Sequence, residues 1–244
     1  MKSSYLDKYI EKSLLKENAI REATHKSSGK LSAGSLGDPL QHQILHSIGV
    51  PKDKLQEYTI RKFRRGNHVE DWLRENMPNL VEKEKFVEYR GVVGYIDAFV
   101  NMEGWDVGKG LMPHEIKSVT NASFKWIKKG GVKRNHALQG CLYALATESP
   151  QFMLHYVASD DYRVESFLVD VKDWQKEVEQ IIDDYNKQKA LGIVPVFEAK
   201  EKWQEDKKYN SFSRFLELSE KEIEELLKNE YQESYKKLKG GDIK

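Results

Sequence analysis

Apolar residues recur along the chain with two spacings, and these separate the expected helices from the expected strands. A spacing of three to four residues indicates a helix with one buried face, whereas alternation or a dense β-branched run indicates a strand. The helical spacing predicts helices over residues 4–24, 39–48, 60–76, 136–147, 171–190 and 219–238. The strand pattern predicts strands over residues 85–90, 93–101 and 111–119 and a hairpin over 151–171. A Gly/Ser-rich loop is expected at 26–38, and a basic, partly helical loop at 122–134.

This order of elements predicts the fold class. Helices and strands alternate, with several strands adjacent in the middle of the chain, so we expect an α/β fold with a central mixed β-sheet flanked by helices. The helices at the two ends are then N- and C-terminal additions. A chain of 244 residues suffices for one large domain. We expect a single domain over 1–244, with a core at about 30–190 and a C-terminal helical extension at 195–244.

Composition narrows the class of protein. Apolar residues make up 39% and charged residues 32% of the sequence, which suits a domain with a buried core and a charged surface. No apolar run reaches the roughly 20 residues of a membrane helix, and the N-terminal stretch lacks the apolar segment of a secretory signal. Cys141 is the single cysteine, which excludes an internal disulfide and a cysteine-bound cluster. These features predict a cytoplasmic protein without a membrane partner.

Two acids and a lysine on neighbouring strands carry the strongest chemical signal. Asp97 lies near the middle of the strand at 93–101, and Glu115 and Lys117 lie two residues apart on the next strand. Side chains at positions i and i+2 of a strand point to the same face, so Glu115 and Lys117 project together while Ile116 packs on the other face. If the two strands pair, Asp97 comes alongside Glu115.

Such a group suits the hydrolysis of a phosphodiester with a divalent cation. Two carboxylates at metal-bridging distance repel each other unless a cation lies between them, and hard oxygen ligands favour Mg²⁺ or Mn²⁺. The metal lowers the pKa of a bound water and neutralises charge on a phosphoryl oxygen, and a lysine beside it positions the water and helps to remove its proton. An E-x-K sequence is, however, most often an exposed strand edge with a salt bridge. Three further features favour the catalytic interpretation.

Polar residues on two predicted helices are the first two features. Glu70, on the helix before the sheet, is placed to supply another carboxylate ligand, although an ordinary solvated glutamate would look the same in sequence. Gln139 and Tyr143 lie one helical turn apart on an otherwise apolar helix, so they face the same way. Buried polar groups need partners, and a DNA backbone, the catalytic lysine or a core neighbour would serve.

Two basic clusters that flank the acids in sequence are the third feature. One precedes Glu70, and the other lies between Lys117 and Gln139. Their members are Arg61, Lys62, Arg64 and Arg65 in the first, and Lys125, Lys128, Lys129, Lys133 and Arg134 in the second. The second also holds Phe124 and Trp126, and aromatic side chains stack on bases or wedge a duplex end. A chain with a net charge of only +1 can still bind phosphate through such clusters.

In order along the chain, four short motifs resemble those of the PD-(D/E)XK nuclease superfamily. They are G-x-x-x-E at Gly66–Glu70, G-x-x-D at Gly94–Asp97, E-x-K at Glu115–Lys117 and Q-x-x-x-Y at Gln139–Tyr143. The pattern is similar to that of the phage lambda-type and RecB-type exonucleases. Residues 31–38 also resemble the short motif before the first core helix of the lambda-type branch. The likeness covers roughly residues 30–190 and implies a restriction-endonuclease-like core.

The resemblance implies a role for the acids and the lysine. Asp97, Glu115 and the Ile116 carbonyl would hold Mg²⁺ or Mn²⁺, and Glu70 would complete the metal shell. Lys117 would orient the attacking water. His68 is not expected as a ligand, because a residue two positions before Glu70 points about 200° away around the helix.

The resemblance also implies a substrate and partners. Gln139 would steady the site or contact the scissile strand, and Tyr143 would join the basic clusters and Trp126 in binding DNA. The implied activity is a DNA exonuclease of recombination or repair that leaves 5′-phosphates and 3′-hydroxyls. A single-strand annealing or recombination protein as partner, and a homo-oligomer, are implied in the same way.

Two alternatives stay open on the sequence. An endonuclease of restriction or junction-resolving type would use the same fold and the same residues. A DNA-binding protein on this fold would lack catalysis, although the intact acids and lysine argue against it. The iron–sulfur members of the superfamily need four cysteines, so a chain with one cysteine is excluded from that variant.

Overall fold

The computed structural model describes residues 5–24, 29–207 and 210–240, which form one sheet and a set of helices. The α-helices are α1 (Tyr5–Thr24), α2 (Leu40–Ser47), α3 (Glu57–Glu75), α4 (Asn121–Gly130), α5 (Arg134–Ala146), α6 (Gln175–Leu191), α7 (Glu220–Glu230) and α8 (Gln232–Leu238). Short 3₁₀ helices are η1 (Ala33–Ser35), η2 (Val171–Asp173), η3 (Lys202–Glu205) and η4 (Ser213–Phe215). Within these residues, no helix has both the length and the apolar character that crossing a bilayer requires.

The sheet contains both parallel and antiparallel pairs. Its strands are β1 (Leu31–Ser32), β2 (Leu80–Tyr89), β3 (Val92–Asn101), β4 (Leu111–Val119), β5 (Gln151–Ala158) and β6 (Val164–Asp170). They follow the order β1-β3-β4-β5-β6, and β2 pairs with the other edge of β3. The pairs β1–β3 and β4–β5 are parallel and the rest are antiparallel. The predicted α/β fold with a central mixed sheet flanked by helices is therefore confirmed.

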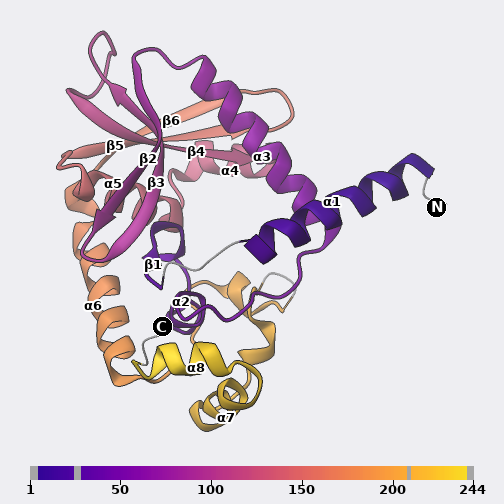
Figure 1. The fold of residues 1–244 in the computed structure, drawn as a ribbon. Helices are drawn as coiled ribbons and strands as arrows, with labels where there is room; N and C mark the ends of the chain where they lie inside the picture. Colours follow the sequence, from indigo (N-terminus) through magenta and orange to yellow (C-terminus); the bar gives the residue numbers. More distant parts are fainter. Residues whose placement is uncertain (1–4, 25–28, 208–209, 241–244) are drawn as a thin grey trace.

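The two faces of the sheet bury different cores. On one face, Val69 of α3 packs against Ile116 and Val100. On the other face, α5 and α6 pack through residues such as Leu138 and Ile182. Figure 1 shows α3 crossing above the sheet, and α7 and α8 gathered near α2 at the far end from the sheet. The larger core extends into these C-terminal helices through buried side chains, among them Phe215, Ile223 and Leu227.

Most predicted elements are present, and three segments differ for identifiable reasons. The expected loop at 26–38 contains β1 and η1 in its described part, because Leu31 and Ala33 are buried against the core. The expected basic loop at 122–134 is mostly helix α4, which Thr120 caps by accepting a hydrogen bond from the Ser123 N–H. The expected last helix divides at Tyr231, whose hydroxyl accepts a hydrogen bond from Arg214.

Helix α1 is held mainly by its contact with α3. Leu14 is its one buried side chain between residues 6 and 20. Arg61 forms an ion pair with Asp7 at 2.9 Å, and Arg64 forms one with Glu17 at 2.8 Å. Exposed ion pairs of this kind contribute about 0–1 kcal/mol each, so the attachment of α1 is weak compared with that of the core helices.

Candidate active site

The predicted acids lie at a fork in the sheet. Strands β3 and β4 pair from Asn101 and Leu111 up to Ala98 and His114, and beyond this point β4 pairs with β5 only. On the same edge of β3, the short strand β1 pairs near the opposite end, at Val92. Between these two partners, that edge of β3 has no strand beside it in the described part of the chain. The fork therefore leaves room for side chains at the centre of the sheet.

Asp97 and Glu115 meet at this fork. The register that pairs Ala98 with His114 would place Asp97 opposite Glu115 as the next pair. Instead of a ladder bond, the Ile116 N–H donates to Asp97 Oδ2 at 2.7 Å. Asp97 is thereby fixed against the strand that carries the second acid, as the sequence predicted for paired strands.

Glu115 and Lys117 project from the same face of β4 and form an ion pair. The Glu115 side chain is 1% exposed, and the Lys117 side chain is 26% exposed. One oxygen of the Glu115 carboxyl contacts the Lys117 ammonium. The Lys117 ammonium is thus the one cation in direct contact with this carboxylate among the described residues.

Burial and mutual repulsion dominate the electrostatics of the fork. Burial, and then the charge of Asp97, raise the pKa of Glu115 to about 8. Burial likewise raises the pKa of Asp97 above its usual range, although Lys117 and the Ile116 hydrogen bond oppose this. Burial lowers the pKa of Lys117, but Glu115 and Asp97 outweigh it and bring this pKa to about 12. The fork therefore gathers more negative charge than its lysine compensates.

Glu70 reaches the same group from α3. Burial, followed by the charge of Asp97, raises the pKa of Glu70 to about 7, and Lys117 opposes the shift. The helix runs close to β4, since a Cβ at Gly66 would lie 4.0 Å from the Ser118 Cβ, an ordinary contact. Position 66 therefore has room for a Cβ atom.

Arg74 is a residue of the site that the sequence analysis missed. It lies one helical turn after Glu70 and is 8% exposed. Its guanidinium donates to Asp71 at 2.7 Å and lies 3.5 Å from Glu84. Its charge also acts on Glu70 and on Asp97, and lowers the pKa of each. The spacing of four residues from Glu70 was the available signal.

Helix α5 brings Gln139 and Tyr143 to the fork. Gln139 Nε2 donates to the Tyr143 hydroxyl at 2.9 Å, so the two residues do face the same way. Tyr143 is 2% exposed, and a Cβ at Gly94 would lie 2.6 Å from its Cε1 atom. Because Gly94 of the G-x-x-D motif has no Cβ atom, the Tyr143 ring can lie directly against β3.

Tyr156 and His136 form a second set beside Lys117 that the sequence analysis did not single out. Tyr156 is the β5 register partner of Lys117. Its hydroxyl accepts a hydrogen bond from the Lys133 N–H at 3.0 Å and lies 3.1 Å from His136 Nδ1. Burial, and then the charge of Lys117, lower the pKa of His136 to about 3, so this imidazole is neutral near pH 7. No sequence spacing links these positions, because three elements bring them together.

The donor set fits a divalent cation that takes part of its coordination from outside the side chains. Among the described residues, no three His, Cys, Asp or Glu side chains converge as a ready metal group. Asp97 and Glu115 offer two carboxylates beside a single contacting ammonium, that of Lys117, so a further cation would find oxygen ligands here. Mg²⁺ is usually held by one or two carboxylates together with waters and substrate phosphate. Glu70 as a further ligand stays a prediction.

The first basic cluster is largely engaged within the protein. Arg61 pairs with Asp7 of α1 and with Glu57, and Arg64 pairs with Glu17. Arg65 is exposed on the same helix. By helical geometry Arg61 points about 180° away from Glu70. Their contact with DNA stays a prediction, and the structure gives the two paired arginines a second task, which is to hold α1.

The second basic cluster lies on and after α4. Trp126 is 76% exposed, whereas Phe124 is 3% exposed and belongs to the core. Phe124 is therefore not available to stack on a base, contrary to expectation. Arg134 pairs with Glu177 at 2.6 Å, and Lys128 lies 3.9 Å from Glu165. The members without a described ion pair are Lys125, Lys129 and Lys133.

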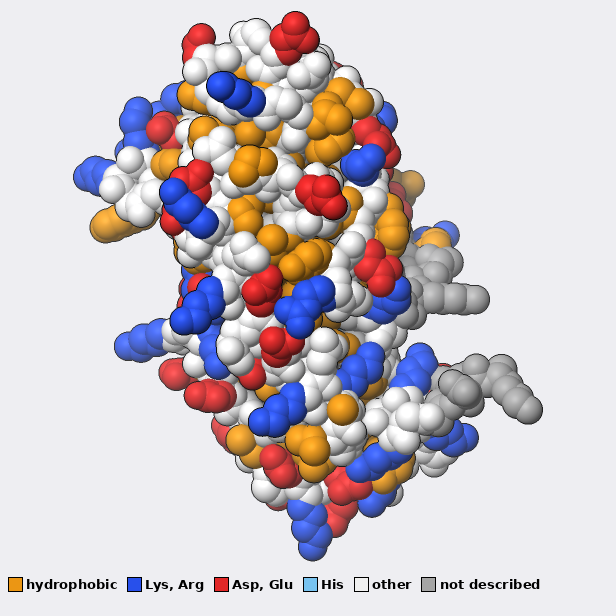
Figure 2. Space-filling view, turned by 90° about the vertical axis from the view of Figure 1, so that its left-hand side faces the viewer, with side chains coloured by type: hydrophobic (Ala, Val, Ile, Leu, Met, Phe, Trp, Pro, Cys, Tyr) orange, Lys and Arg blue, Asp and Glu red, His pale blue; other side chains and the backbone are white. Residues whose placement is uncertain are grey.

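The surface at the left of Figure 1 offers no such cluster. Figure 2 shows basic and acidic side chains mixed over this face, with apolar side chains between them. Because acidic and basic side chains are mixed on this face, their electric fields largely cancel beyond about one Debye length. This face is therefore a poor candidate for binding a phosphate backbone.

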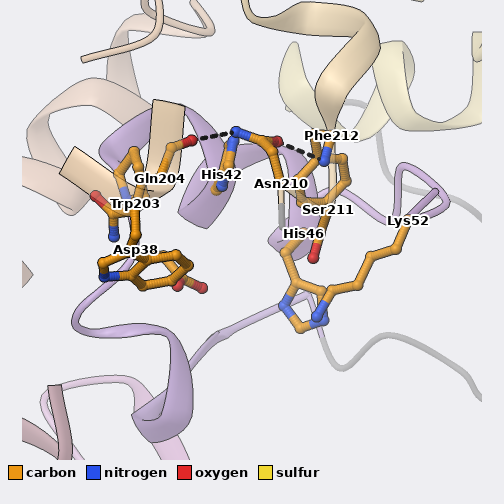
Figure 3. Close-up of a pocket in the computed structure, with 10 residues that line it drawn as sticks. Asp38, His42, His46, Lys52, Trp203, Gln204, Asn210, Ser211 and Phe212 are labelled. Atoms are coloured by element: carbon orange, nitrogen blue, oxygen red, sulfur yellow. Dashed lines mark hydrogen bonds between the residues drawn. The ribbon is translucent and has the colours of Figure 1, made fainter. Parts of the chain in front are cut away.

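A polar pocket of about 80 Å³ lies apart from the fork, between α2 and the segment around η3. Figure 3 shows His42 between two groups of lining side chains, with Asp38 and Trp203 on one side and His46 and Lys52 on the other. His42 is 7% exposed, and its Nε2 atom has no hydrogen-bond partner within the described residues. Burial lowers the pKa of His42 to about 4. None of the fork residues lines this pocket.

Comparison with known proteins gives similarity at the level of structure. No protein-family model matches the chain, and no curated protein matches it in sequence. Solved exonuclease structures are among those it resembles. An alkaline exonuclease from Laribacter hongkongensis is 15% identical over 66% of this chain and 90% of its own, with a TM-score of 0.47.

Two further solved structures are similar to the same extent. The same exonuclease in complex with dAMP is 13% identical over 66% of this chain and 89% of that one, with a TM-score of 0.48. The protein SSO0001 is 14% identical over 86% of this chain and 96% of its own, with a TM-score of 0.48. Similarity of this degree concerns the course of the chain alone.

Proposed function

We propose that the protein is a metal-dependent DNA nuclease whose active site is the fork between β3 and β4. The observation that carries this proposal is the meeting of a buried carboxylate, Glu115, and a partly buried one, Asp97, with Lys117 on one face of the sheet. A purely structural salt bridge needs one acid for one base. Here Glu70 and Asp97 add negative charge to a site that already pairs Lys117 with Glu115. Such an excess is unfavourable in a fold unless protons or a cation offset it, as the raised pKa values of Glu70 and Glu115 indicate.

The residues that would hold Mg²⁺ or Mn²⁺ are Asp97, Glu115 and the Ile116 carbonyl, with Glu70 as a fourth candidate. When bound, the cation activates a water and offsets charge on the phosphoryl group. The Ile116 N–H fixes Asp97 on its strand, so its carboxylate keeps one orientation. Strand β5 supports the other acid, because Glu115 pairs in register with Leu154. Both acids are thus placed by backbone contacts rather than by flexible loops.

Lys117 acts as a hydrogen-bond donor and a positive charge. Glu115 and Asp97 raise its pKa to about 12, so in the metal-free protein the ammonium is protonated and can orient a water or a phosphate oxygen. Its expected help in removing the proton from water stays a prediction. Gln139 and Tyr143 lie at the same fork, where Gln139 donates to the tyrosine hydroxyl and would contact the substrate strand. Preorganised donors of this kind act on the charge that develops in the transition state.

The finer proposal is an exonuclease that leaves 5′-phosphates and acts in recombination or repair. Its support is the order of the four motifs and the basic helix α4, which directly follows β4. DNA would be bound by the exposed lysines Lys128, Lys129 and Lys133, together with the exposed Arg65 of α3. A recombination partner and a homo-oligomer belong to the same proposal.

Cleavage of linear and covalently closed DNA of the same sequence tests the proposal. Both substrates are incubated with Mg²⁺, with Mn²⁺ and with a chelator, and the products are end-labelled. Metal-dependent loss of linear DNA with 5′-phosphate products and intact circles is expected. Linearised circles would replace the exonuclease with an endonuclease, and binding without turnover in either metal would leave only a DNA-binding protein.

A further inference from the structure

Helix α4 is a short projection with both ends fastened beside the candidate active site. Its N-cap, Thr120, lies three residues after Lys117, and its hydroxyl accepts a hydrogen bond from the Ser123 N–H. After the helix the chain returns to the same place, because the Lys133 N–H donates to the hydroxyl of Tyr156. Tyr156 is the register partner of Lys117 on β5. The position of α4 relative to the fork is therefore fixed at two points.

The inner side of α4 is part of the core, which makes it a rigid support. Phe124 and Ile127 are each 3% exposed and pack against the larger core. Arg163, from the β5–β6 turn, lies over the Phe124 ring with its Cζ 5.2 Å from the ring centroid. The helix thus presents its outer side in one orientation.

Trp126 lies on this outer side and is exposed to solvent. At 76% exposure it is the most exposed of the large apolar side chains described, and it makes no ring contact or cation–π contact in the described part of the chain. An indole buries a large apolar area when it finds a partner, so an exposed one on a rigid helix is a candidate contact surface.

The charges around Trp126 indicate the class of ligand that this surface can bind. The sequence of α4 contains three lysines and no acid, and Lys125 and Lys129 have no ion pair among the described residues. The nearest acid to a lysine of this helix is Glu165, at 3.9 Å from Lys128. A lone aromatic ring between exposed lysines matches a nucleic-acid strand, which offers a base to stack on and phosphates on both sides.

We propose that Trp126 is a stacking platform for an unpaired base, so that α4 engages single-stranded or frayed DNA at the entrance to the fork. This inference rests on the proposed function in taking DNA as the ligand, and it adds the class of substrate. A paired base is already stacked within a duplex and offers no free face to the indole. A membrane surface is the poorer fit, because interfacial helices insert several apolar side chains, and Phe124 and Ile127 are occupied in the core.

The test is equilibrium binding in chelator, where cleavage does not contribute. Anisotropy of a labelled 20-nucleotide single strand is compared with that of a blunt duplex for wild type, Trp126→Ala and Trp126→Phe. The matched control is Trp203→Ala, which removes another exposed tryptophan, 47% exposed, on the C-terminal segment. Trp126→Ala should weaken single-strand binding about 5- to 150-fold, and Trp126→Phe should recover most of it. The Trp203→Ala variant should bind like wild type.

Salt dependence separates stacking from phosphate contact. Trp126→Ala should leave the slope of log K against log salt unchanged, whereas the pair Lys125→Gln and Lys129→Gln should reduce it by roughly 0.7 per lost phosphate contact. Equal effects of Trp126→Ala and Trp203→Ala, or an equal loss on the blunt duplex, would overturn the proposal. So would Trp126-dependent binding to vesicles of phosphatidylserine and phosphatidylcholine without an effect on DNA.

The two proposals fail separately. If no metal supports cleavage but Trp126→Ala lowers single-strand affinity, the stacking platform stands and the nuclease falls. If the protein cleaves DNA while all tryptophan variants bind alike, the nuclease stands and the platform falls. Circular dichroism of each variant checks that the exposed substitutions leave the fold intact.

Discussion

Gly94 of β3 lies so close to the ring of Tyr143 that a Cβ atom at position 94 would be 2.6 Å from Tyr143 Cε1. The same Cβ would lie 2.8 Å from the Cβ of Ala33, in the turn after β1. Three elements therefore meet at one glycine, three residues before Asp97. The edge of β3 that carries the acid is shaped by this contact, and Gln139 holds the tyrosine from the other side.

The two motif glycines should respond to alanine in opposite directions. Gly94→Ala should destabilise the protein by about 1–3 kcal/mol, because neither the ring nor the Ala33 backbone can yield without repacking. Gly66→Ala should stabilise it by roughly 0.5–1 kcal/mol, since the new Cβ meets Ser118 at an ordinary distance within a helix. Urea unfolding of both variants checks this. A loss of stability in Gly66→Ala, or none in Gly94→Ala, would contradict the described packing.

Removal of the site charges should abolish cleavage and spare the fold. Asp97→Asn keeps an oxygen that accepts the Ile116 N–H, and Lys117→Met keeps most of the aliphatic chain. Each should lower the cleavage rate at least about 10²–10³-fold, the effect of losing one preorganised electrostatic contact. Thermal unfolding of Asp97→Asn should stay close to that of wild type, and Lys117→Met should still fold although it leaves buried Glu115 without its cation, as circular dichroism would show. The controls are Asp106→Asn in the β3–β4 turn and Lys221→Met on α7, both exposed residues. Near-normal activity of either site variant would show that the reaction uses other residues.

The unfolding free energy of the metal-free protein should depend on pH through the ionisation of Glu70. Its pKa of about 7 in the fold lies above the ordinary 4.5, so the folded state favours the protonated form. The contribution of Glu70 to the free energy of unfolding is fully present below about pH 4.5, where both states are protonated. It is lost as the pH rises through about 7, because the unfolded chain releases the proton at a lower pH than the folded one. Relative to wild type, Glu70→Gln should therefore become more stable across this window and then level off.

Unfolding in chelator at a series of pH values measures this difference. Buried His42, His114, His136 and His155 have lowered pKa values, so they destabilise both proteins alike as the pH falls below about 6.5, and the comparison cancels them. Glu75→Gln, at the exposed end of the same helix, is the control. If the difference in unfolding free energy between Glu70→Gln and wild type does not change between pH 4.5 and 7, Glu70 does not interact with the charges of the fork.

The two basic clusters should differ in their effect on DNA binding. Lys129→Gln and Lys133→Gln should each reduce the salt dependence of binding, because these ammonium groups have no described ion pair to lose. Arg61→Gln and Arg64→Gln should change it less, since these guanidinium groups already pair with Asp7 and Glu17. Salt titrations of binding in chelator compare the four variants. A larger effect of the arginines would mean that DNA displaces α1.

The arginine variants should instead loosen α1. With two exposed ion pairs and Leu14 as its main attachments, α1 should become accessible to protease at lower enzyme concentrations. Limited proteolysis followed by mass spectrometry locates the cuts. Unchanged protease resistance of residues 5–24 in a variant with both Arg61→Gln and Arg64→Gln would show that the ion pairs do not hold this helix.

The sequence by itself determined the elements and the local pairs of the site. Periodicity located the main strands and helices, and a spacing of two put Glu115 and Lys117 on one face of β4. A spacing of four brought Gln139 to Tyr143. These are properties of single strands and helices, whose geometry repeats at fixed intervals and can be read from residue spacing.

The tertiary structure alone decided what meets across elements. It seated β1 on the edge of β3, set Tyr156 and His136 beside Lys117, buried Phe124 while exposing Trp126, and turned two expected DNA contacts towards α1. Contacts of this kind depend on how faces pack and on which chain segment covers them. Packing joins residues far apart in sequence, so residue spacing carries no record of it.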